Sequence, residues 1–337
     1  MIAVRSRAPQ RARLSALGAY VPEQVVTNAD FVARMDTTDE WIVSRTGIRE
    51  RRYARPDQAT SDLAIEAARA VLDDAGLPAA DVDALIVPTC TPDHLFPSVA
   101  AITADAIGAH NAAAFDIEAA CSGFIYGLSQ ATALVESGFA RNVLVVGAEL
   151  FSRLVDPDDR STCILFGDGA AGALVTAGDP GDTDGFLGFD LGADGSLACE
   201  LLLPVGGTRQ PASQPFAREA AYVQMNGREV FRFATRVMEE TTVRILEAVG
   251  LGIDDIDLLV AHQANQRIID HAIGRLGFDP AKVFNNVEHY GNTSAASIPL
   301  ALWEARQAGV LRPGMQTLLV GFGAGLTWGA TVVRYEP

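Results

Sequence analysis

The chain has 337 residues, of which 49% are hydrophobic and 20% are charged, and this balance excludes a disordered or collagen-like chain. It carries 26 Lys and Arg against 42 Asp and Glu, and the net charge of −16 makes nucleic acid and anionic membranes unexpected partners. No apolar run approaches the ~18 residues that a transmembrane helix needs. The composition therefore predicts a globular protein with a large buried core.

The cysteines Cys90, Cys121, Cys163 and Cys199 are spread along the chain, with no CxxC pair and no histidine at metal-ligand spacing. A chain of this length needs no disulfide framework, so we expect a reducing cytoplasm in which each cysteine is a small buried hydrophobe or a nucleophile. The arginine-rich residues 1–12 lack the apolar stretch of a secretory signal. We expect a frayed basic tail there, with a short organellar transit peptide as the alternative.

An internal repeat predicts the architecture. The matching segments are AGLPAADVDALIVP (75–88) with VGLGIDDIDLLVAH (249–262), and NVLVVG (142–147) with QTLLVG (316–321). Both pairs are offset by 174 residues, which indicates an ancestral duplication because chance similarity would not keep one register twice. We expect two similar α/β halves, residues 1–180 and 181–337, packed as one unit without a flexible linker.

Each half repeats the same order of elements. A helical pattern over residues 61–75 ends at Gly76, and its counterpart over 229–249 ends at Gly250. Both glycines suit a left-handed cap, and Ser61 is the expected N-cap of the first helix. Unalternating apolar runs follow both helices, and such runs are typical of strands that helices cover on both faces.

The first candidate site lies where an apolar strand leads into a helix, in the segment DIEAACSGF (116–124). Cys121 falls at this junction, where unpaired backbone N–H groups and the helix dipole favour a thiolate. The small residues around it leave room for a substrate. A buried cysteine that fills a tight turn is the open alternative.

Two polar residues follow strands in the second half. His262 ends the apolar run LLVAH, at the carboxyl end of a strand, where side chains commonly open into a cleft. Asn292 lies in GNTSAAS (291–297), before a helix, at a point of its repeat comparable to that of Cys121. A structural histidine, an asparagine that caps the helix and a competing His289 are the alternatives. Taken together, the residues predict a Cys–His–Asn constellation for acyl chemistry.

Two glycine-rich segments are expected to be backbone loops. Gly321, Gly323 and Gly325 are spaced G-x-G-x-G, which fails the dinucleotide-binding pattern and indicates a hairpin before a final strand. Closely approaching N–H groups in this hairpin could form an oxyanion site. Residues 164–175 (ILFGDGAAGALV) are expected to form a similar turn with a structural role only.

These segments together resemble β-ketoacyl-acyl-carrier-protein synthase III, the initiating condensing enzyme of type II fatty-acid synthesis, over residues of about 13–337. The motifs that carry the resemblance are TTDEWIVSRTGIRERR (37–52), AACSGF (119–124), DPDDRSTCILFGDGA (156–170), HQANQRI (262–268), GNTSAAS (291–297) and GFGAGLTWG (321–329). The resemblance implies an α/β thiolase fold, with two βαβαβαββ halves in a five-layer αβαβα arrangement. It also implies a homodimer.

By the same resemblance, catalysis is assigned to Cys121, His262 and Asn292. An acyl-CoA primer would acylate Cys121, and malonyl-acyl-carrier-protein would then enter. His262 and Asn292 would stabilise the enolate formed as carbon dioxide leaves. The backbone N–H groups of Cys121 and Ala324 would hold the oxyanion; the glycine often found at the position of Ala324 is replaced, but its N–H remains. No metal is implied, and no cofactor other than coenzyme A as part of the substrate.

The resemblance further implies which residues bind substrates. The set for the primer is Trp41 and Arg160, which would sandwich the adenine of coenzyme A, with Arg45, Thr46 and Asn265 nearby, and Phe96, which would shape the acyl pocket across the dimer interface. An acidic carrier protein requires a local basic patch on this acidic chain. The candidates are Arg228, Arg232, Arg267 and Arg275, and ordinary solvated helix charges are the alternative.

Other functions remain open at this point. A starter-unit synthase of a polyketide pathway, or an acyltransferase of the same fold that acts on a hydroxyl or amine, could carry the same Cys–His–Asn set. The intact trio argues against a non-catalytic scaffold. Primer length and branching depend on packing around Phe96 and residues 197–216, which the sequence leaves open.

Overall fold

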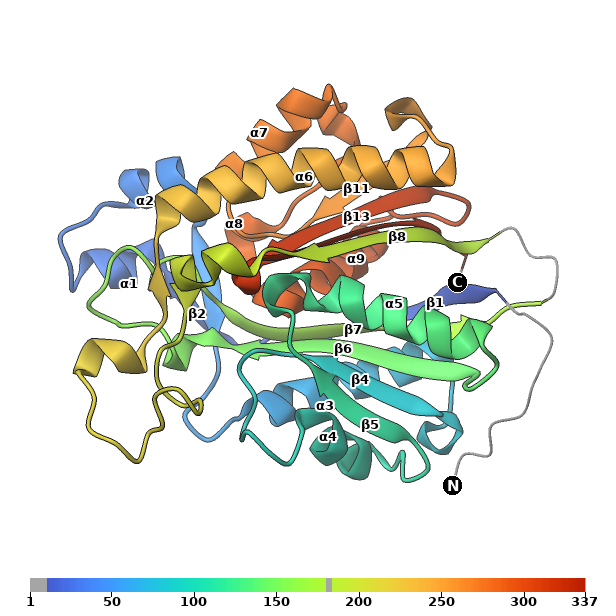
Figure 1. Ribbon diagram of the computed structural model, residues 1–337, viewed down its shortest axis with the longest axis horizontal. Coiled ribbons are helices and arrows are strands. Elements are labelled where there is room, and N and C mark those ends of the chain that lie inside the picture. The colour runs from blue at the N-terminus through green and yellow to red at the C-terminus, as the bar shows by residue number, and fades with distance from the viewer. Residues whose placement is uncertain (1–10, 180–183, 337) are drawn as a thin grey trace.

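The computed structural model describes residues 11–179 and 184–336. Its centre is a pair of five-stranded sheets with the same strand order (Figure 1). The first sheet has the order β1 (Ala12–Tyr20), β7 (Asp168–Ala177), β6 (Asn142–Leu150), β4 (Ala84–Pro88), β5 (Ala113–Ile117). The second has the order β8 (Gly185–Ala193), β14 (Thr327–Arg334), β13 (Gln316–Gly323), β11 (Leu258–Ala261), β12 (Val283–Phe284). The expected boundary between halves, at residue 180, lies outside the described residues.

The two sheets share a pairing register as well as a strand order. Ala84 of β4 pairs with Val143 of β6, and Leu258 of β11 pairs with Thr317 of β13, both in parallel. The residue numbers of both partners are 174 higher in the second sheet than in the first. The offset in the sequence is therefore the offset between equivalent backbone positions of a duplicated fold, and the expected order βαβαβαββ is present on each side.

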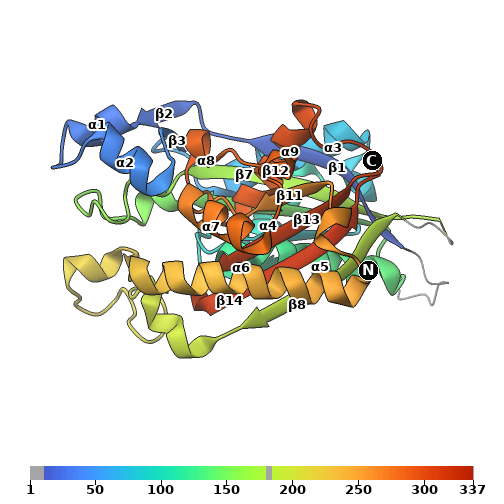
Figure 2. The same ribbon diagram turned by 90° about the horizontal axis from the view of Figure 1, so that it is seen from above.

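Helices form three layers around the sheets, which makes five layers in all (Figures 1 and 2). The outer helices are α3 (Thr60–Ala75) and α4 (Val99–Ile107) on the first sheet, with α6 (Gly227–Val249) and α7 (Gln266–Leu276) on the second. Between the sheets lie α5 (Gly123–Glu136) and α9 (Ser297–Gln307). The αβαβα arrangement expected from the resemblance is confirmed.

The central layer forms the largest part of the core. Phe124 and Leu128 of α5 and Ile298 and Leu302 of α9 are at most 1% exposed, and they pack against strands of both sheets. Burial of one such side chain contributes about 1.5–3 kcal/mol. The two halves therefore share one continuous core and hold the loops at their common edge in a fixed relation.

The helix ends agree with the sequence analysis except at one cap. Gly76 and Gly250 have φ values of 60° and 73°, the left-handed conformation expected at these ends. However, α3 begins one residue before Ser61, and its N-cap is Ala59. The Ala59 N–H donates to the Asp62 carboxylate at 2.7 Å. The prediction of Ser61 as the cap is wrong because this carboxylate supplies the capping contact.

The expectation for residues 164–175 is wrong for most of the segment. Only its first residues form a turn, and from Asp168 onward the chain is strand β7, which lies between β1 and β6. Glycine serves close strand packing here, because a Cβ at Gly172 would lie 2.5 Å from the Val145 carbonyl oxygen. The predicted hairpin at residues 321–325 is confirmed, since β13 and β14 pair antiparallel around it.

Two excursions from the sheets lie at one end of the molecule (Figures 1 and 2). The first contains β2 (Gln24–Thr27), α1 (Asn28–Val32), α2 (Asp39–Thr46) and β3 (Glu50–Tyr53), and the second contains β9 (Leu201–Leu202) and β10 (Gln224–Met225). Both supply walls of the cavity described below. Among the described residues, none of the helices combines the length and apolarity that crossing a bilayer requires.

Candidate active site

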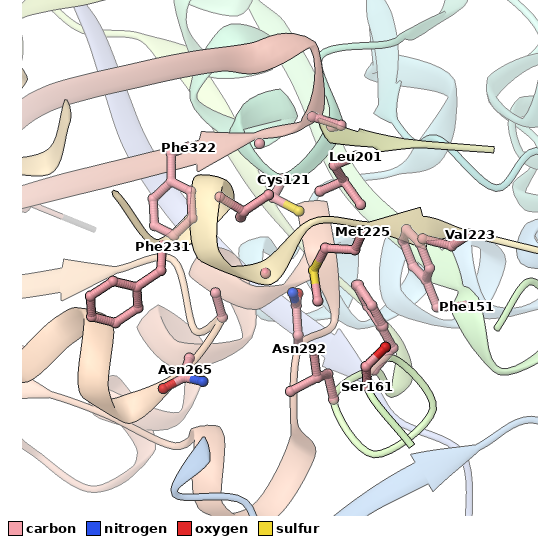
Figure 3. Close-up of a pocket in the computed structure, with 18 of the residues that line it drawn as sticks. Cys121, Phe151, Ser161, Leu201, Val223, Met225, Phe231, Asn265, Asn292 and Phe322 are labelled. Atoms are coloured by element: carbon pink, nitrogen blue, oxygen red, sulfur yellow. The ribbon is translucent and has the colours of Figure 1, made fainter. Parts of the chain in front are cut away.

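A cavity of about 640 Å³ opens where the two halves meet the two excursions. Among its lining residues are nine that the sequence analysis assigned to catalysis or substrate binding: Trp41, Arg45, Thr46, Cys121, Arg160, His262, Asn265, Asn292 and Ala324. Figure 3 shows the Cys121 sulfur and the Asn292 amide directed into the same space. The structure thus brings the candidate nucleophile and its two candidate partners to one cavity, although they come from three separate segments.

Cys121 lies in the single turn η2 (Ala120–Ser122), which leads from β5 into α5. The hairpin of the second half packs directly on this turn, since a Cβ at Gly323 would lie 2.6 Å from the Cys121 backbone nitrogen. This close approach brings the next residue, Ala324, beside the nucleophile. Burial raises the pKa of the Cys121 thiol to about 12, the reverse of the direction expected from the helix N-terminus alone.

His262 is buried at the end of β11, and its protonation is set by its surroundings. Its Nδ1 lies 2.7 Å from the Ser297 hydroxyl, which in turn accepts the Gln263 N–H at 3.4 Å. The Ser297 hydrogen is available to donate to Nδ1, and that bond would place the proton of the neutral ring on Nε2. Burial lowers the pKa of His262 to about 3, so the ring is neutral near pH 7.

Asn292 follows Gly291 in the loop before α9. Its side-chain oxygen accepts the backbone N–H of Ser294 at 2.8 Å, which leaves the amide nitrogen to point into the cavity. The side chain therefore closes a local turn, as the structural alternative proposed, and also offers a donor to the cavity. One contact serves both purposes, because it fixes which end of the amide faces inward.

Glu149 is a functional candidate that sequence reasoning missed. It lies near the end of β6, is 0% exposed, and accepts hydrogen bonds from the hydroxyls of Thr91 (2.7 Å) and Ser294 (2.9 Å). The Cys90 backbone N–H lies 3.3 Å from both of its oxygens. Burial raises the pKa of this carboxyl to about 7. A lone carboxylate in the apolar run of residues 142–150 is the signal that could have found it.

The mouth of the cavity carries aromatic and cationic groups. The guanidinium carbon of Arg160 lies 4.8 Å from the centre of the Trp41 ring, and that of Arg45 lies 5.9 Å from it. Asn265 caps α7 and donates its side-chain amide to the Arg45 carbonyl at 3.0 Å. The buried Thr46 hydroxyl donates to its own helix at Ile42, so only part of this residue faces the cavity.

The deeper wall of the cavity is apolar. Phe151 stacks on Phe166 with ring centroids 4.6 Å apart, and Leu201, Val223 and Met225 complete the wall (Figure 3). Such a surface suits an acyl chain rather than a polar group. Phe96 is not among the lining residues of this cavity; its side chain stands on the surface, 86% exposed.

The four candidate docking arginines lie outside the cavity. Arg275 pairs with Glu239 at 3.1 Å and Arg232 pairs with Glu229 at 3.1 Å, so both are partly neutralised. Arg267 lies 5.6 Å above the ring of Phe231, a residue of the cavity wall. Arg228 follows Gly227, which also lines the cavity.

No group of three or more His, Cys, Asp or Glu side chains within residues 11–179 and 184–336 has an arrangement that could hold a metal ion.

Two family models and many curated proteins are similar to this chain. Residues 115–195 match the family model "3-Oxoacyl-[acyl-carrier-protein (ACP)] synthase III", and residues 246–335 match the model for its C-terminal part. The chain is 51% identical over 320 residues to the β-ketoacyl-[acyl-carrier-protein] synthase III of Caldanaerobacter subterraneus, with 95% of this chain and 96% of the relative covered.

Solved structures of two kinds are similar to the chain. The chain is similar to the β-ketoacyl-[acyl-carrier-protein] synthase III of Thermus thermophilus, with 51% identity, a TM-score of 0.89 and coverage of 96% and 99%. It is also similar to the priming β-ketosynthase of the R1128 polyketide pathway, with 36% identity, a TM-score of 0.91 and 99% of both chains covered.

Proposed function

The chain belongs to the β-ketoacyl-[acyl-carrier-protein] synthase III family, and from this premise we propose that it joins an acyl-CoA primer to malonyl-acyl-carrier-protein. The products are 3-oxoacyl-acyl-carrier-protein, carbon dioxide and coenzyme A, and the reaction initiates fatty-acid synthesis. The observation that carries this proposal is the meeting of Cys121, His262 and Asn292 at one cavity with an apolar inner wall.

In the first half-reaction, the Cys121 sulfur attacks the carbonyl carbon of the acyl-CoA thioester. Negative charge develops on the carbonyl oxygen, and the backbone N–H groups of Cys121 and Ala324 stabilise it. The tight packing of Gly323 on the Cys121 amide supports this role, because it brings both amides to one place. Coenzyme A then leaves and the acyl group stays on Cys121.

In the second half-reaction, malonyl-acyl-carrier-protein enters the same cavity. The Nε2–H of His262 and the amide nitrogen of Asn292 donate to the malonyl thioester oxygen and stabilise the enolate formed as carbon dioxide leaves. The enolate carbon attacks the acyl carbonyl and releases Cys121. The neutral state of His262 supports this role, because the donor needs no change of protonation between pH 5 and 8.

We assign the nucleotide of coenzyme A to Trp41 and Arg160, with Arg45, Thr46 and Asn265 beside them. An adenine between two flat groups needs about 7 Å, twice an ordinary carbon contact distance. The 4.8 Å between Arg160 and the Trp41 ring is shorter than this. Binding of the nucleotide therefore moves the Arg160 guanidinium away from the ring, and its bond to the Asp36 carbonyl must also change.

We propose a homodimer in which Phe96 reaches the acyl pocket of the partner. Two features support it: Leu95 and Phe96 are 78% and 86% exposed, and β5 is an edge strand paired only with β4 among the described residues. Large exposed apolar side chains beside an open strand edge are typical of a surface that another chain covers. We also propose that the enzyme is cytoplasmic and that its chemistry uses side chains and backbone amides alone.

The test is to offer a panel of acyl-CoAs and to identify by intact mass which acyl group the protein acquires. Malonyl-acyl-carrier-protein is then added, and 3-oxoacyl-acyl-carrier-protein is measured. A protein that gains no acyl mass from any primer, or gains it without forming the condensation product, contradicts the proposal.

A second candidate function is priming of a polyketide, which the 36% identity to a priming β-ketosynthase favours. The two functions are distinguished by comparing kcat/KM for malonyl groups carried by fatty-acid and by polyketide carrier proteins. A preference of tenfold or more for the polyketide carrier would favour the second function.

A further inference from the structure

The hydroxyl of Ser294 lies between the buried carboxyl of Glu149 and the proposed nucleophile, Cys121. The Ser294 hydroxyl donates to Glu149 at 2.9 Å and lies 3.8 Å from the Cys90 sulfur, and it also hydrogen-bonds to the Cys121 thiol, whose pKa this bond lowers. The three side chains come from β6, from the turn η8 (Ser294–Ala296) and from η2. They form a continuous polar chain from the nucleophile into the core, in surroundings where all three residues are at most 6% exposed.

The backbone holds this chain in place. A Cβ at Gly147 of β6 would lie 2.4 Å from the Ala295 carbonyl oxygen, so η8 packs directly against the strand that carries Glu149. Ser294 itself has a φ of +48°, which L-residues rarely adopt, while its N–H is held by Asn292. Ser294 is therefore fixed by its backbone, and its hydroxyl is left to bridge Cys121 and Glu149.

The neighbours of Glu149 are hydrogen-bond donors, which suits a carboxylate that is ionised at rest. Thr91 donates to its second oxygen at 2.7 Å, and the backbone N–H and thiol of Cys90 lie 3.3 Å from its oxygens. The titratable groups that face this pair are Cys90, on the loop after β4, and Glu118, before η2. Burial raises the pKa of Glu149 to about 7, which makes its carboxylate a proton acceptor matched to neutral pH.

We propose that Glu149 accepts the Cys121 thiol proton through the Ser294 hydroxyl during acylation, and returns it to Cys121 after condensation. This inference rests on the proposed function. In acylation the Cys121 Sγ–carbon bond forms and the carbon–sulfur bond to coenzyme A breaks. Ser294 passes its hydrogen to Glu149 as it receives the thiol hydrogen, and coenzyme A departs as a thiolate that takes a proton from solvent.

The second half-reaction closes the cycle. When the enolate carbon forms its bond to the acyl carbonyl, the bond to Cys121 breaks and leaves a thiolate. Glu149 then gives its proton back through Ser294, and both groups return to their starting states. The negative charge lies on Glu149 in the free enzyme, leaves with coenzyme A in the acyl-enzyme, and lies on Cys121 when condensation releases the thiolate. The two groups are therefore never ionised together in the buried site. Over both steps one proton is taken from solvent, by coenzyme A.

The direction of the Glu149→Gln effect separates this relay from simple electrostatics. As a fixed negative charge, Glu149 raises the pKa of Cys121, so its neutralisation alone would make the thiolate easier to form and acylation faster. The relay predicts the opposite. Without an acceptor the thiol must lose its proton to solvent, so we expect acylation at pH 7 to fall at least tenfold.

The experiment measures single-turnover acylation by an acyl-CoA between pH 5.5 and 10, with Glu149→Gln and Ser294→Ala as test variants. The acylation rate of the natural protein should rise with pH and become constant above the pKa of Glu149. The rates of both variants should be lower and should continue to rise up to high pH. Ser294→Ala retains the backbone N–H that holds Asn292, so it serves as the second test if Glu149→Gln fails to fold. A variant that keeps the plateau, is faster, or is slowed equally at every pH overturns the relay.

Matched controls alter the surroundings of Glu149 without cutting the chain. Thr91→Val removes a hydrogen bond to the other carboxylate oxygen, which should raise the midpoint of the profile and preserve its plateau. Cys90→Ala removes the neighbouring thiol and should also preserve the plateau. A plateau lost in either control would show that packing around Glu149, and not proton transfer, sets the rate.

Two further measurements keep this proposal separate from the proposed function. Decarboxylation of malonyl-acyl-carrier-protein without primer needs no thiolate, so Glu149→Gln and Ser294→Ala should retain it within about threefold. Alkylation of Cys121 by iodoacetamide, followed by peptide mass, should show the same pH profiles as acylation. If no acyl-CoA loads the natural protein, the proposed function fails, and the alkylation profiles still decide the relay.

Discussion

The Ser297 hydroxyl lies 2.7 Å from Nδ1 of His262, and both residues are buried. Because Ser297 begins α9 and His262 directly follows β11, one contact between these two elements orients the His262 ring. The same short segment also positions Asn292 through the N–H of Ser294. The two proposed donors to the malonyl thioester are therefore oriented by one short segment: Ser297 orients His262, and the backbone of Ser294 orients Asn292.

Ser297→Ala should reduce malonyl decarboxylation by about tenfold, the effect of one lost hydrogen bond on the population of the Nε2–H tautomer. Acylation of Cys121 should change by less than about threefold, because His262 is assigned to the second half-reaction. The two half-reactions are measured separately, by carbon dioxide release and by acyl-protein mass. Equal losses in both would contradict the role assigned to Ser297.

Asn292→Ala should slow malonyl decarboxylation on the order of 100–1,000-fold, the usual cost of removing a donor to a developing oxyanion. Acylation should be affected far less, since Asn292 donates to the malonyl group only. Asn292→Asp is the matched variant: it keeps an acceptor for the Ser294 N–H but loses the amide donor. If Asn292→Asp decarboxylates like the natural protein, Asn292 acts through the backbone turn alone.

Cys121 should be the only cysteine acylated by acyl-CoA, although Cys90 lines the same cavity. Burial and the adjacent Glu149 raise the pKa of Cys90 well above its usual range. The backbone amides proposed to hold the carbonyl oxygen, those of Cys121 and Ala324, are placed for attack by Cys121. Peptide mapping of loaded protein should find the adduct at Cys121, and Cys121→Ala should acquire none. Acyl mass on Cys121→Ala would disprove the assignment.

The buried, neutral His262 should lower the stability of the protein in acid. Its folded-state pKa of about 3 lies below the unfolded value near 6.5, so the unfolded chain binds one more proton between these values. The free energy of unfolding should therefore fall as pH drops from 6.5 toward 3, by up to about 1.4 kcal/mol per pH unit from this residue. The free energy of unfolding, measured in urea at several pH values, should depend less on pH in His262→Gln than in the natural protein. Parallel pH dependences in the two proteins would contradict this prediction.

Arg267→Glu combined with Arg275→Glu should raise the KM for malonyl-acyl-carrier-protein, most strongly at low ionic strength, because rim charges act on encounter and are screened by salt. Acylation by acyl-CoA should barely change. Most of the effect should come from Arg267, since Arg275 already pairs with Glu239. The control is Arg69→Glu with Arg141→Glu, which alters net charge equally elsewhere; the same KM change there would mean that net charge, and not docking, is responsible.

The fold was predictable because a duplication leaves a measurable trace. The offset of 174 residues identified β4 with β11 and β6 with β13, and the structure pairs these strands in equivalent registers. We expected Cys121, His262 and Asn292 each to follow a strand. This is correct for Cys121 and His262, which follow β5 and β11, but wrong for Asn292, which follows the short helix α8 (Val287–Tyr290).

The supporting residues were not predictable in the same way. Glu149 and Ser294 are 145 positions apart, and nothing local links a carboxylate at a strand end to a serine in a turn of the other half. The sign of the Cys121 pKa shift was also missed, because burial depends on the hairpin at Gly323, which packs on the nucleophile from the far end of the chain.

The repeated register has a last consequence, which concerns the symmetry of the site. Counted by the same offset, Ala120 and Ser294 are counterparts, and their φ values are +45° and +48°. The Ala120 N–H bonds to Glu118 as the Ser294 N–H bonds to Asn292, at 3.1 and 2.8 Å. Both halves therefore contain the same turn, in which a residue with positive φ donates its N–H to the side chain two positions before it, although the side chains differ.

The counterpart of the His262–Ser297 pair is Pro88 with Gly123, where a Cβ on the glycine would lie 3.0 Å from the proline ring. That pair is packed and apolar, so it has no proton to place. In the proposed mechanism one half therefore supplies the sulfur and the other supplies the donors. The equivalent pair, Pro88 and Gly123, contributes packing only. Neither half separated from the other could carry out the reaction.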